Sequence, residues 1–148
     1  MSALAVFLAA GLSAAELVGK VTKVSDGDTV WVTDKKGARE KIRLNGIDAP
    51  ESKQPFGKES TKMLATKIAG KEVKVDYDGR DMYGRILGTI YYKDKDVNLE
   101  MVAEGGAWVY YTNKDPAYLE ALNAAKEAKK GLWKDANALN PYEWRKRH

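Results

Sequence analysis

The sequence predicts an α+β protein in which five β-strands form a barrel and three α-helices pack around it. Two observations carry this prediction. Five short segments are typical of strands, among them residues 40–45, which alternate apolar and polar side chains, and three others are typical of helices, among them residues 55–69, which carry apolar residues at helical spacing. One helical segment lies between the third and fourth strands, which is the order of elements in an OB-fold, a five-stranded Greek-key barrel.

The five predicted strands are rich in β-branched and aromatic residues. They are expected at residues 17–24, 29–33, 40–45, 72–77 and 86–92. A turn of sequence Asp-Lys-Lys-Gly separates the second strand from the third, because Gly37 can adopt positive φ. In the third strand, Ile42 and Leu44 share one face, so Arg43 points to the other.

The three predicted helices cover residues 55–69, 97–104 and 116–130. Glycines follow each of them, as is common after the end of a helix. The third helix has the clearest start, since Asp115 can cap it and Pro116 suits its first position. Residues 132–148 are expected to be irregular, with aromatic side chains anchoring them to the domain.

Residues 1–15 contain no charged side chain. Their apolar run has the length of a signal-peptide core, and Ser13-Ala14-Ala15 suits cleavage. The run is too short to span a bilayer. We therefore expect an export signal, a secreted or periplasmic protein, and a mature domain of residues 16–148 that does not enter a membrane. The alternative is an apolar helix that packs on the domain, since no Lys or Arg precedes the apolar run.

Composition excludes several kinds of chemistry. The chain has no cysteine, and its only histidine is the last residue, His148. Disulfides, cysteine–zinc sites and thiol nucleophiles are therefore excluded, and a serine nucleophile has no plausible histidine partner. Catalysis must then use carboxylates, arginines, lysines, tyrosines or a metal. The net charge of +4 favours a polyanionic partner, but many basic domains bind nothing acidic.

Acidic residues gather between Asp26 and Glu51. Asp28 and Asp48 could offer carboxylate oxygens to a hard cation such as Ca²⁺, which prefers several oxygen ligands. The Asp-Gly-Asp-Thr stretch is not an EF-hand loop, and on its own it is more typical of a turn. Glu51 follows Pro50 and could orient or deprotonate a water that attacks phosphorus.

Two arginines extend this set. Arg43 lies in the middle of a strand and Arg85 lies in a turn before one. Two guanidinium groups can clamp a phosphodiester and neutralise the charge that develops on it. Nearby aromatic residues could stack on bases of any sequence. These are Tyr83, Trp108, Tyr110 and Tyr111, although an aromatic residue between Ala107 and Val109, as Trp108 is, usually belongs to the core.

Together these motifs resemble the staphylococcal nuclease (thermonuclease) family. The matching segments are Asp26–Val30, Ile42–Leu44, Ile47–Glu51, Tyr83–Arg85 and Gly131–Trp133, and the resemblance runs from about residue 17 to 145. It implies a calcium-dependent nuclease with an OB-fold that hydrolyses DNA and RNA and leaves 3′-phosphates.

The resemblance also implies roles for individual residues. Asp28, Asp48 and the carbonyl of Ala49 would bind calcium, Arg43, Glu51 and Arg85 would be catalytic, and Tyr83 and Tyr111 would line the nucleotide pocket. The family prototype has threonine at the position of Ala49. This change does not remove the main-chain carbonyl that would bind calcium. Met82 replaces a basic residue, so one phosphate contact is expected to be missing.

Two other functions stay open. One is an OB-fold protein that binds nucleic acid without cleaving it, in a salt-dependent way. The combination of Asp28, Asp48 and Glu51 argues against this reading, since a pure binder does not need all three. The other is an extracellular domain that binds another protein. We therefore predict a monomeric nuclease without a stable protein partner.

Overall fold

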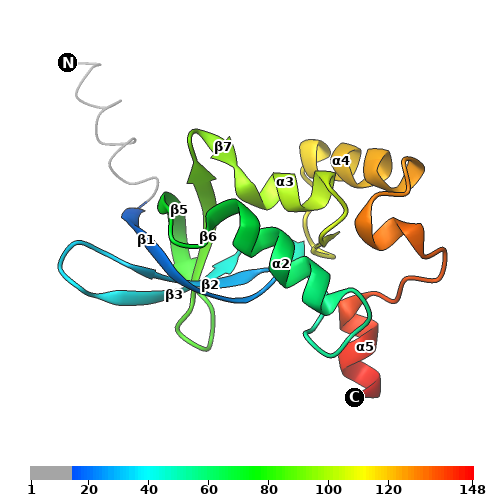
Figure 1. Cartoon of the computed structure of the whole chain (residues 1–148), viewed down its shortest axis with the longest axis horizontal. Coiled ribbons are helices and arrows are strands. Elements are labelled where there is room, and N and C mark those ends of the chain that lie inside the picture. The colour runs from blue at the N-terminus through cyan, green and yellow to red at the C-terminus, as the bar shows by residue number, and fades with distance from the viewer. Residues whose placement is uncertain (1–14) are drawn as a thin grey trace.

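The computed structural model describes residues 15–148 of the chain. The predicted signal peptide lies outside these residues, apart from Ala15, which begins the first strand. Within the described part, no helix combines the length and the apolar character that a membrane crossing requires. Figure 1 shows a β-barrel toward one side of the molecule and most of the helices toward the other.

Five strands close the barrel, as the sequence predicts. They are β1 (Ala15–Asp26), β2 (Thr29–Thr33), β3 (Arg39–Leu44), β5 (Glu72–Arg80) and β6 (Ile86–Tyr92). They pair antiparallel in the order β3-β2-β1-β5-β6, and β6 returns to pair in parallel with β3. The helix α2 (Gly57–Ile68) falls between the third and fourth barrel strands, so the OB-type Greek-key barrel is confirmed.

The first strand is long enough to pair with two partners. Residues 15–20 of β1 pair with β5, and residues 20–26 pair with β2. The pairing with β2 shifts register twice, near Lys23 and again before Asp26. Such irregularities bend and twist a strand, so β1 curves around the barrel and delivers Asp26 to its rim.

Branched aliphatic side chains fill the barrel. Those with no exposed surface include Val30, Val32, Ile42, Leu44, Val75, Ile86 and Ile90, together with Leu64 and Ile68 of α2. Successive side chains of a strand point to opposite faces. The burial of Ile42 and Leu44 therefore turns Arg43 outward, which is the orientation that the sequence predicts.

Two further helices were expected and are present. They are α3 (Val97–Ala103) and α4 (Pro116–Glu127). The Asp115 side chain caps α4 by accepting a hydrogen bond from the backbone N–H of Ala117 at 3.0 Å. The helix predicted at residues 55–69, α2, begins at Gly57 instead of residue 55, because Phe56 adopts a left-handed conformation with φ 72°.

The expectation that residues 132–148 are irregular is wrong. Residues Gly131–Lys134 form a 3₁₀-helix, and Pro141–Arg147 form a fourth α-helix, α5. Asn140 caps α5 by accepting a hydrogen bond from the Tyr142 N–H at 2.8 Å, and Pro141 follows it. This is the same start signal as in α4. A seven-residue helix is too short to show a helical period in the sequence.

Two short strands complete the frame of the site. Strand β4 (Ile47–Asp48) pairs with β8 (Trp108–Val109). A third short strand, β7 (Lys95–Asp96), extends the sheet beyond β6. The β4–β8 pair holds Asp48 opposite Trp108, so the carboxylate sits on a fixed element and not on a free loop.

Candidate active site

A cleft of about 630 Å³ opens where the β1–β2 turn, the β3–β4 connection, the β5–β6 loop and α5 meet. All eight site residues predicted from the sequence line it. They are Asp28, Arg43, Asp48, Ala49, Glu51, Tyr83, Arg85 and Tyr111. The fold thus brings together side chains that lie in five separate segments of the chain.

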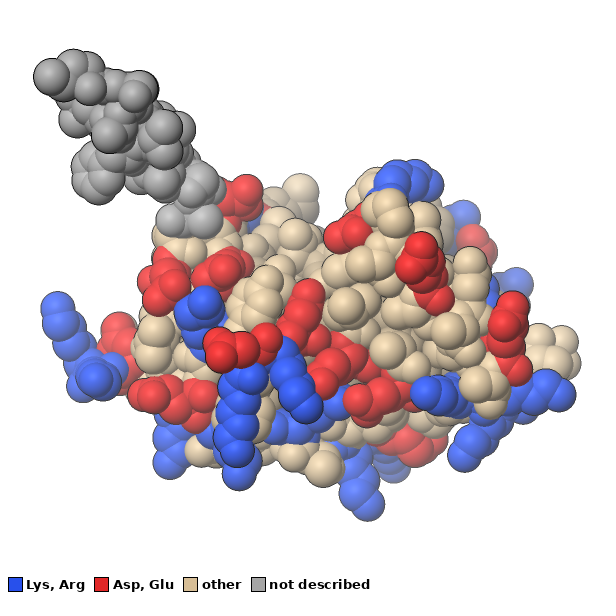
Figure 2. All heavy atoms as spheres, turned by 90° about the horizontal axis from the view of Figure 1, so that it is seen from above, with Lys and Arg blue, Asp and Glu red and all other residues tan. Residues whose placement is uncertain are grey.

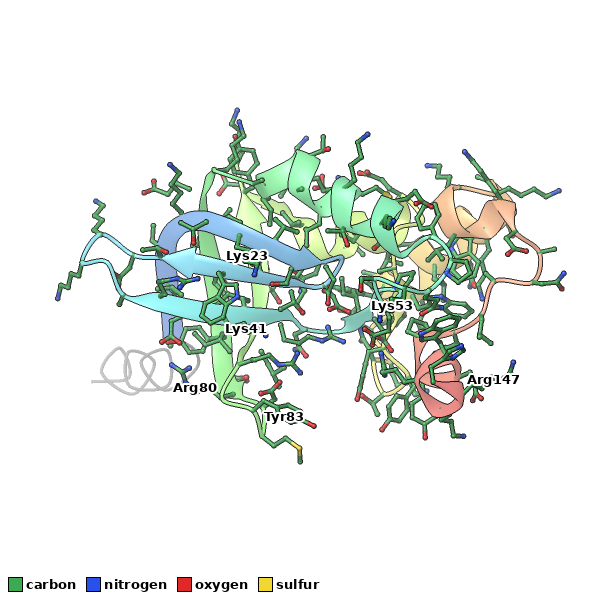
Figure 3. The ribbon with its side chains drawn as sticks, turned by 60° about the horizontal axis from the view of Figure 1, so that its bottom comes forward. Lys23, Lys41, Lys53, Arg80, Tyr83 and Arg147 are labelled. Atoms are coloured by element: carbon green, nitrogen blue, oxygen red, sulfur yellow. The ribbon has the colours of Figure 1, made fainter. Side chains whose placement is uncertain are left out.

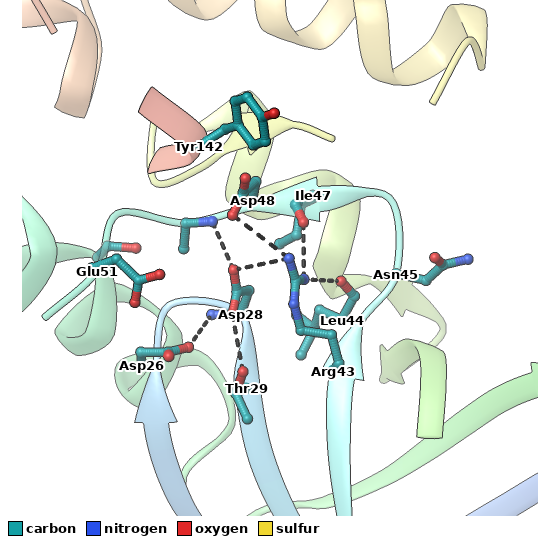
Figure 4. Close-up of polar contacts among 12 residues, drawn as sticks. Asp26, Asp28, Thr29, Arg43, Leu44, Asn45, Ile47, Asp48, Glu51 and Tyr142 are labelled. Atoms are coloured by element: carbon teal, nitrogen blue, oxygen red, sulfur yellow. Dashed lines mark hydrogen bonds and ion pairs between the residues drawn. The ribbon is translucent and has the colours of Figure 1, made fainter. Parts of the chain in front are cut away.

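The β1–β2 turn presents Asp28 in a fixed orientation (Figure 4). One carboxylate oxygen of Asp28 accepts a hydrogen bond from the Thr29 hydroxyl at 3.0 Å, and the other accepts one from the Ala49 N–H at 2.8 Å. Asp26 closes the turn by accepting a hydrogen bond from the Asp28 N–H at 3.0 Å. Asp28 is only 6% exposed, so its negative charge is directed toward the cleft side.

Glycine is required inside this turn. A Cβ atom at Gly27 would lie 1.9 Å from the Ser60 hydroxyl oxygen of α2 and 2.8 Å from the Ala49 Cβ. Ser60 is itself fixed, because its hydroxyl donates to the Gly106 carbonyl at 2.7 Å. The Asp-Gly-Asp motif therefore packs directly against α2, and the turn has no room to shift.

Asp48 faces Asp28 across the guanidinium of Arg43. The Arg43 Nη2 atom lies 3.4 Å from Asp28 Oδ2 and 3.6 Å from Asp48 Oδ1. Burial raises the pKa of the Asp48 carboxyl above its ordinary value, although the nearby arginines favour its charged form. The buried carboxylates of Asp28 and Asp48 therefore form ion pairs with the same guanidinium group, that of Arg43.

Arg43 is held rigidly on its second side. Its Nη1 atom donates to the carbonyl oxygens of Leu44 at 2.6 Å and Ile47 at 2.9 Å, which the bend between β3 and β4 brings together. The side chain is 14% exposed. A planar guanidinium fixed in this way loses little entropy when it binds an anion.

Arg85 is anchored differently. Its Nε atom donates to the Asp81 carboxylate at 2.6 Å, and the second oxygen of Asp81 accepts the backbone N–H groups of Tyr83 and Arg85, each at 2.9 Å. Among the described residues, the two Nη atoms of Arg85 have no hydrogen-bond or ion-pair partner. These two amino groups are therefore free to bind an anion in the cleft.

Sequence reasoning missed Arg145, which comes from α5. Its Nη1 atom lies 2.9 Å from Glu51 Oε1, and its Nη2 atom lies 3.1 Å from Asp48 Oδ2. Burial opposes its charged form, but the two carboxylates raise the pKa of Arg145 above its ordinary value. The cap of α5 was the only feature of the sequence from which a helix at this arginine could have been predicted, and it was overlooked.

Asp26 and two further tyrosines also line the cleft. Burial, together with the negative charge of Asp28, raises the pKa of Asp26 to about 7. The ring of Tyr111 lies 4.8 Å from that of Tyr110 and 6.0 Å from that of Tyr142. These rings form an aromatic wall that suits base stacking. From the sequence, Tyr142 was expected only to anchor residues 132–148 to the domain.

Trp108 does not line the cleft. Its ring packs edge-on against Trp133, with centroids 4.6 Å apart, so it contributes to packing as the core interpretation proposed.

The oxygen donors fit a hard cation. Residues 15–148 hold no group of three or more acidic, His or Cys side chains arranged around a metal position. The site instead offers two carboxylates, from Asp28 and Asp48, beside the main chain of Ala49. Such a set suits Ca²⁺, which accepts backbone carbonyls and waters together with carboxylates.

The chain is similar to proteins of one known family. A family model described as staphylococcal nuclease homologue matches residues 41–135. An uncharacterized endonuclease of Escherichia coli is 48% identical over 135 residues, which cover 90% of this chain and 88% of that protein. A similar endonuclease of Haemophilus influenzae is 42% identical over 128 residues, covering 86% and 72%. The micrococcal nuclease of Shigella flexneri is 36% identical over 144 residues, covering 89% and 82%.

Proposed function

The chain belongs to the staphylococcal nuclease family, and from that premise we propose that it is a calcium-dependent nuclease that hydrolyses both DNA and RNA. Family membership implies nucleic-acid substrates. The observation that most supports the finer proposal is the convergence of Asp28, Asp48 and Glu51 with two arginines on one cleft. A protein that only bound nucleic acid would not need this set.

Asp28, Asp48 and the carbonyl of Ala49 would hold the cation. When bound, Ca²⁺ would offset phosphate charge and help to position the attacking water. The two carboxylates are suited to this role because hydrogen bonds and the β4–β8 pair already fix their positions.

Arg43 and Arg85 would bind the scissile phosphate from two sides. Arg43 is held by backbone carbonyls, and Arg85 is held through Nε alone, which leaves its amino groups for the phosphate oxygens. Preorganised donors of this kind stabilise the charge of a pentacoordinate transition state better than mobile ones. Arg85 is the better placed of the two to make new bonds, since its Nη atoms have no hydrogen-bond or ion-pair partner within residues 15–148.

Glu51 would accept a proton from the attacking water. The water oxygen forms the new bond to phosphorus, and the bond from phosphorus to the 5′-oxygen breaks. The 5′-oxygen then takes a proton from solvent, and the phosphate stays on the 3′-oxygen. Contact with Arg145 holds the Glu51 carboxylate at the edge of the cleft, beside Asp48.

One assay tests this proposal. The purified protein should degrade labelled single-stranded DNA and RNA with Ca²⁺ present, and it should stop when a calcium chelator is added. The new ends should resist labelling at the 3′ side until a phosphatase is added. Salt-dependent binding without any cleavage would favour the non-catalytic alternative instead.

We also propose that the protein acts outside the cytoplasm, as a secreted or periplasmic monomer. The support is the uncharged, apolar composition of residues 1–15. Mass spectrometry of protein purified from its host would test this, since export with cleavage predicts a mature chain that begins close to residue 16.

A further inference from the structure

A row of cations leads along β3 into the cleft. Arg39, Lys41 and Arg43 occupy alternate positions of β3, opposite to the buried side chains of Ile42 and Leu44. Because a strand rises about 3.3 Å per residue, these cations follow one another at intervals of about 6.6 Å. The row begins near the tip of the β2–β3 hairpin and ends at Arg43, which lines the cleft.

The neighbouring strands strengthen this row. Trp31 of β2 lies in register with Lys41 on one side and with Lys23 of β1 on the other. The Arg39 guanidinium carbon lies 4.5 Å from the centre of the Trp31 ring, and the Lys41 ammonium lies 5.7 Å from it. The indole therefore holds both cations above the sheet, which reduces the entropy they lose on binding an anion.

Apart from Arg43, the cations of this face have no acidic partner within the described part of the chain. Among residues 15–148, neither Lys23, Arg39 nor Lys41 forms an ion pair. The one carboxylate within β3, that of Glu40, is engaged by Arg80 through two hydrogen bonds of 2.9 and 2.8 Å. Its charge is therefore compensated.

The charge distribution differs between faces of the molecule. Figure 2 shows acidic and basic side chains mixed on the face seen from above, with acidic groups across its middle. Figure 3 shows Lys23 and Lys41 on either side of β2 in the exposed β1–β2–β3 sheet, with Tyr83 on the loop beside that sheet. The exposed face of the β1–β2–β3 sheet therefore carries unpaired cations that complement a polyanion.

We propose that Lys23, Trp31, Arg39 and Lys41 form an extension of the active site, here named the β3 track, that binds the backbone of a single-stranded polynucleotide beyond the scissile phosphate. A single line of cations can follow one phosphate backbone, which favours a single strand over a duplex. Contacts to phosphates carry no sequence information, so backbone binding by the track is independent of sequence. This inference rests on the proposed function, because it extends the same substrate.

The test compares two double variants with the same loss of charge. Arg39→Gln/Lys41→Gln removes two cations from the β3 track. Lys129→Gln/Lys130→Gln removes two exposed lysines just beyond α4, and Figure 1 shows that end of α4 on the opposite side of the molecule from the β2–β3 hairpin. Thermal melting of both variants would establish that each is folded.

Binding of a fluorescent single-stranded 20-mer is measured in chelator by anisotropy, over a series of salt concentrations. The track variant should bind about tenfold more weakly than the control variant at low salt. Its slope of log Kd against log salt should fall by about 1.4, since each phosphate contact of a single strand contributes about 0.7. Equal affinities and equal slopes for the two variants would overturn the inference.

A second measurement separates this inference from the proposed function. Hydrolysis of a p-nitrophenyl phosphodiester of thymidine, which is too short to reach Lys41, should be the same in both variants when Ca²⁺ is present. Wild-type protein that fails to hydrolyse this ester and the 20-mer would contradict the nuclease proposal, while the binding comparison would still decide the β3 track. A wild-type protein that does not bind the 20-mer in chelator but cleaves it with Ca²⁺ would overturn the β3 track alone.

Discussion

Arg145 of α5 contacts Asp48 and Glu51 with a single guanidinium group, at 3.1 and 2.9 Å. Asp48 lies on β4 and Glu51 on the loop that follows it, so the last helix of the chain is linked directly to the acidic side of the cleft. The same Asp48 carboxylate lies 3.6 Å from Arg43. Any divalent cation that binds Asp48 must therefore do so against the positive charge of Arg145.

Arg145→Gln should raise the affinity for Ca²⁺, because it removes a positive charge from the carboxylate that would bind the metal. Arg145 is partly exposed and its charge is screened, so we expect a change of about fivefold, or about 1 kcal/mol. Isothermal titration calorimetry with Ca²⁺ measures it. The control is Arg147→Gln, an exposed position of the same helix. Affinities that match in the two variants would mean that Arg145 does not compete with the cation.

Arg85→Lys should lower kcat by about 10² with little change in KM, because lysine keeps the charge but loses the planar pair of donors that would bind the transition state. Arg80→Lys is the matched control, since Arg80 is exposed and does not line the cleft. Steady-state kinetics on single-stranded DNA separate the two constants. A rise in KM at constant kcat would instead give Arg85 a role in ground-state binding only.

Gly27→Ala should destabilise the protein by about 1–3 kcal/mol, as overpacking a tight site does. The added Cβ would lie 1.9 Å from the Ser60 hydroxyl oxygen. Urea denaturation in the presence of a chelator measures the loss. Adding Ser60→Ala should recover part of it, because the closest atom is then absent. A Gly27→Ala protein with wild-type stability would show that the turn can move away from α2.

Glu40→Gln should destabilise the protein at pH 7 by about 0.5 kcal/mol, since an exposed ion pair contributes little. The hydrogen bond and charge of Arg80 lower the pKa of Glu40 below its ordinary value of 4.5. A carboxyl whose pKa is lower in the folded protein than in the unfolded one stabilises the fold at pH values above the unfolded-state pKa. This stabilisation is lost as the pH falls through the folded-state pKa. The difference between wild type and variant in denaturant titrations should therefore shrink below pH 4.5. A constant difference across that range would contradict the assignment.

The barrel and the acidic set could be predicted because local patterns encode them. Alternation of Ile42, Arg43 and Leu44 is enough to place the arginine outside the barrel. The Asp-Gly-Asp turn and the Asp48 motif lie within 21 residues of each other. Family resemblance supplied the remaining roles, since no spacing rule connects Arg85 to Asp28.

The contribution of α5 could not be predicted in this way. Arg145 meets Asp48 across 97 positions of sequence, and the segment between them gives no rule for where the chain returns. The raised pKa of Asp26 has a similar origin, because it depends on burial that only the assembled turn produces. Long-range contacts and burial are properties of the fold, and a local pattern does not carry them.

Calcium should stabilise the protein against heat, and Asp28→Asn should abolish this effect. A ligand that binds only the folded state adds about 2.7 kcal/mol at a concentration of 100 Kd, which for a domain of this size corresponds to a rise in Tm of about 5–10 °C. Asp28 is buried and oriented by Thr29 and the Ala49 N–H, so the asparagine variant keeps the shape of the turn but loses the ligand charge. Asp78→Asn, at an exposed position of β5 away from the cleft, should keep the full response. Thermal melts with calcium and with chelator give the comparison without any turnover, so an equal rise in Tm for both variants would place the cation elsewhere.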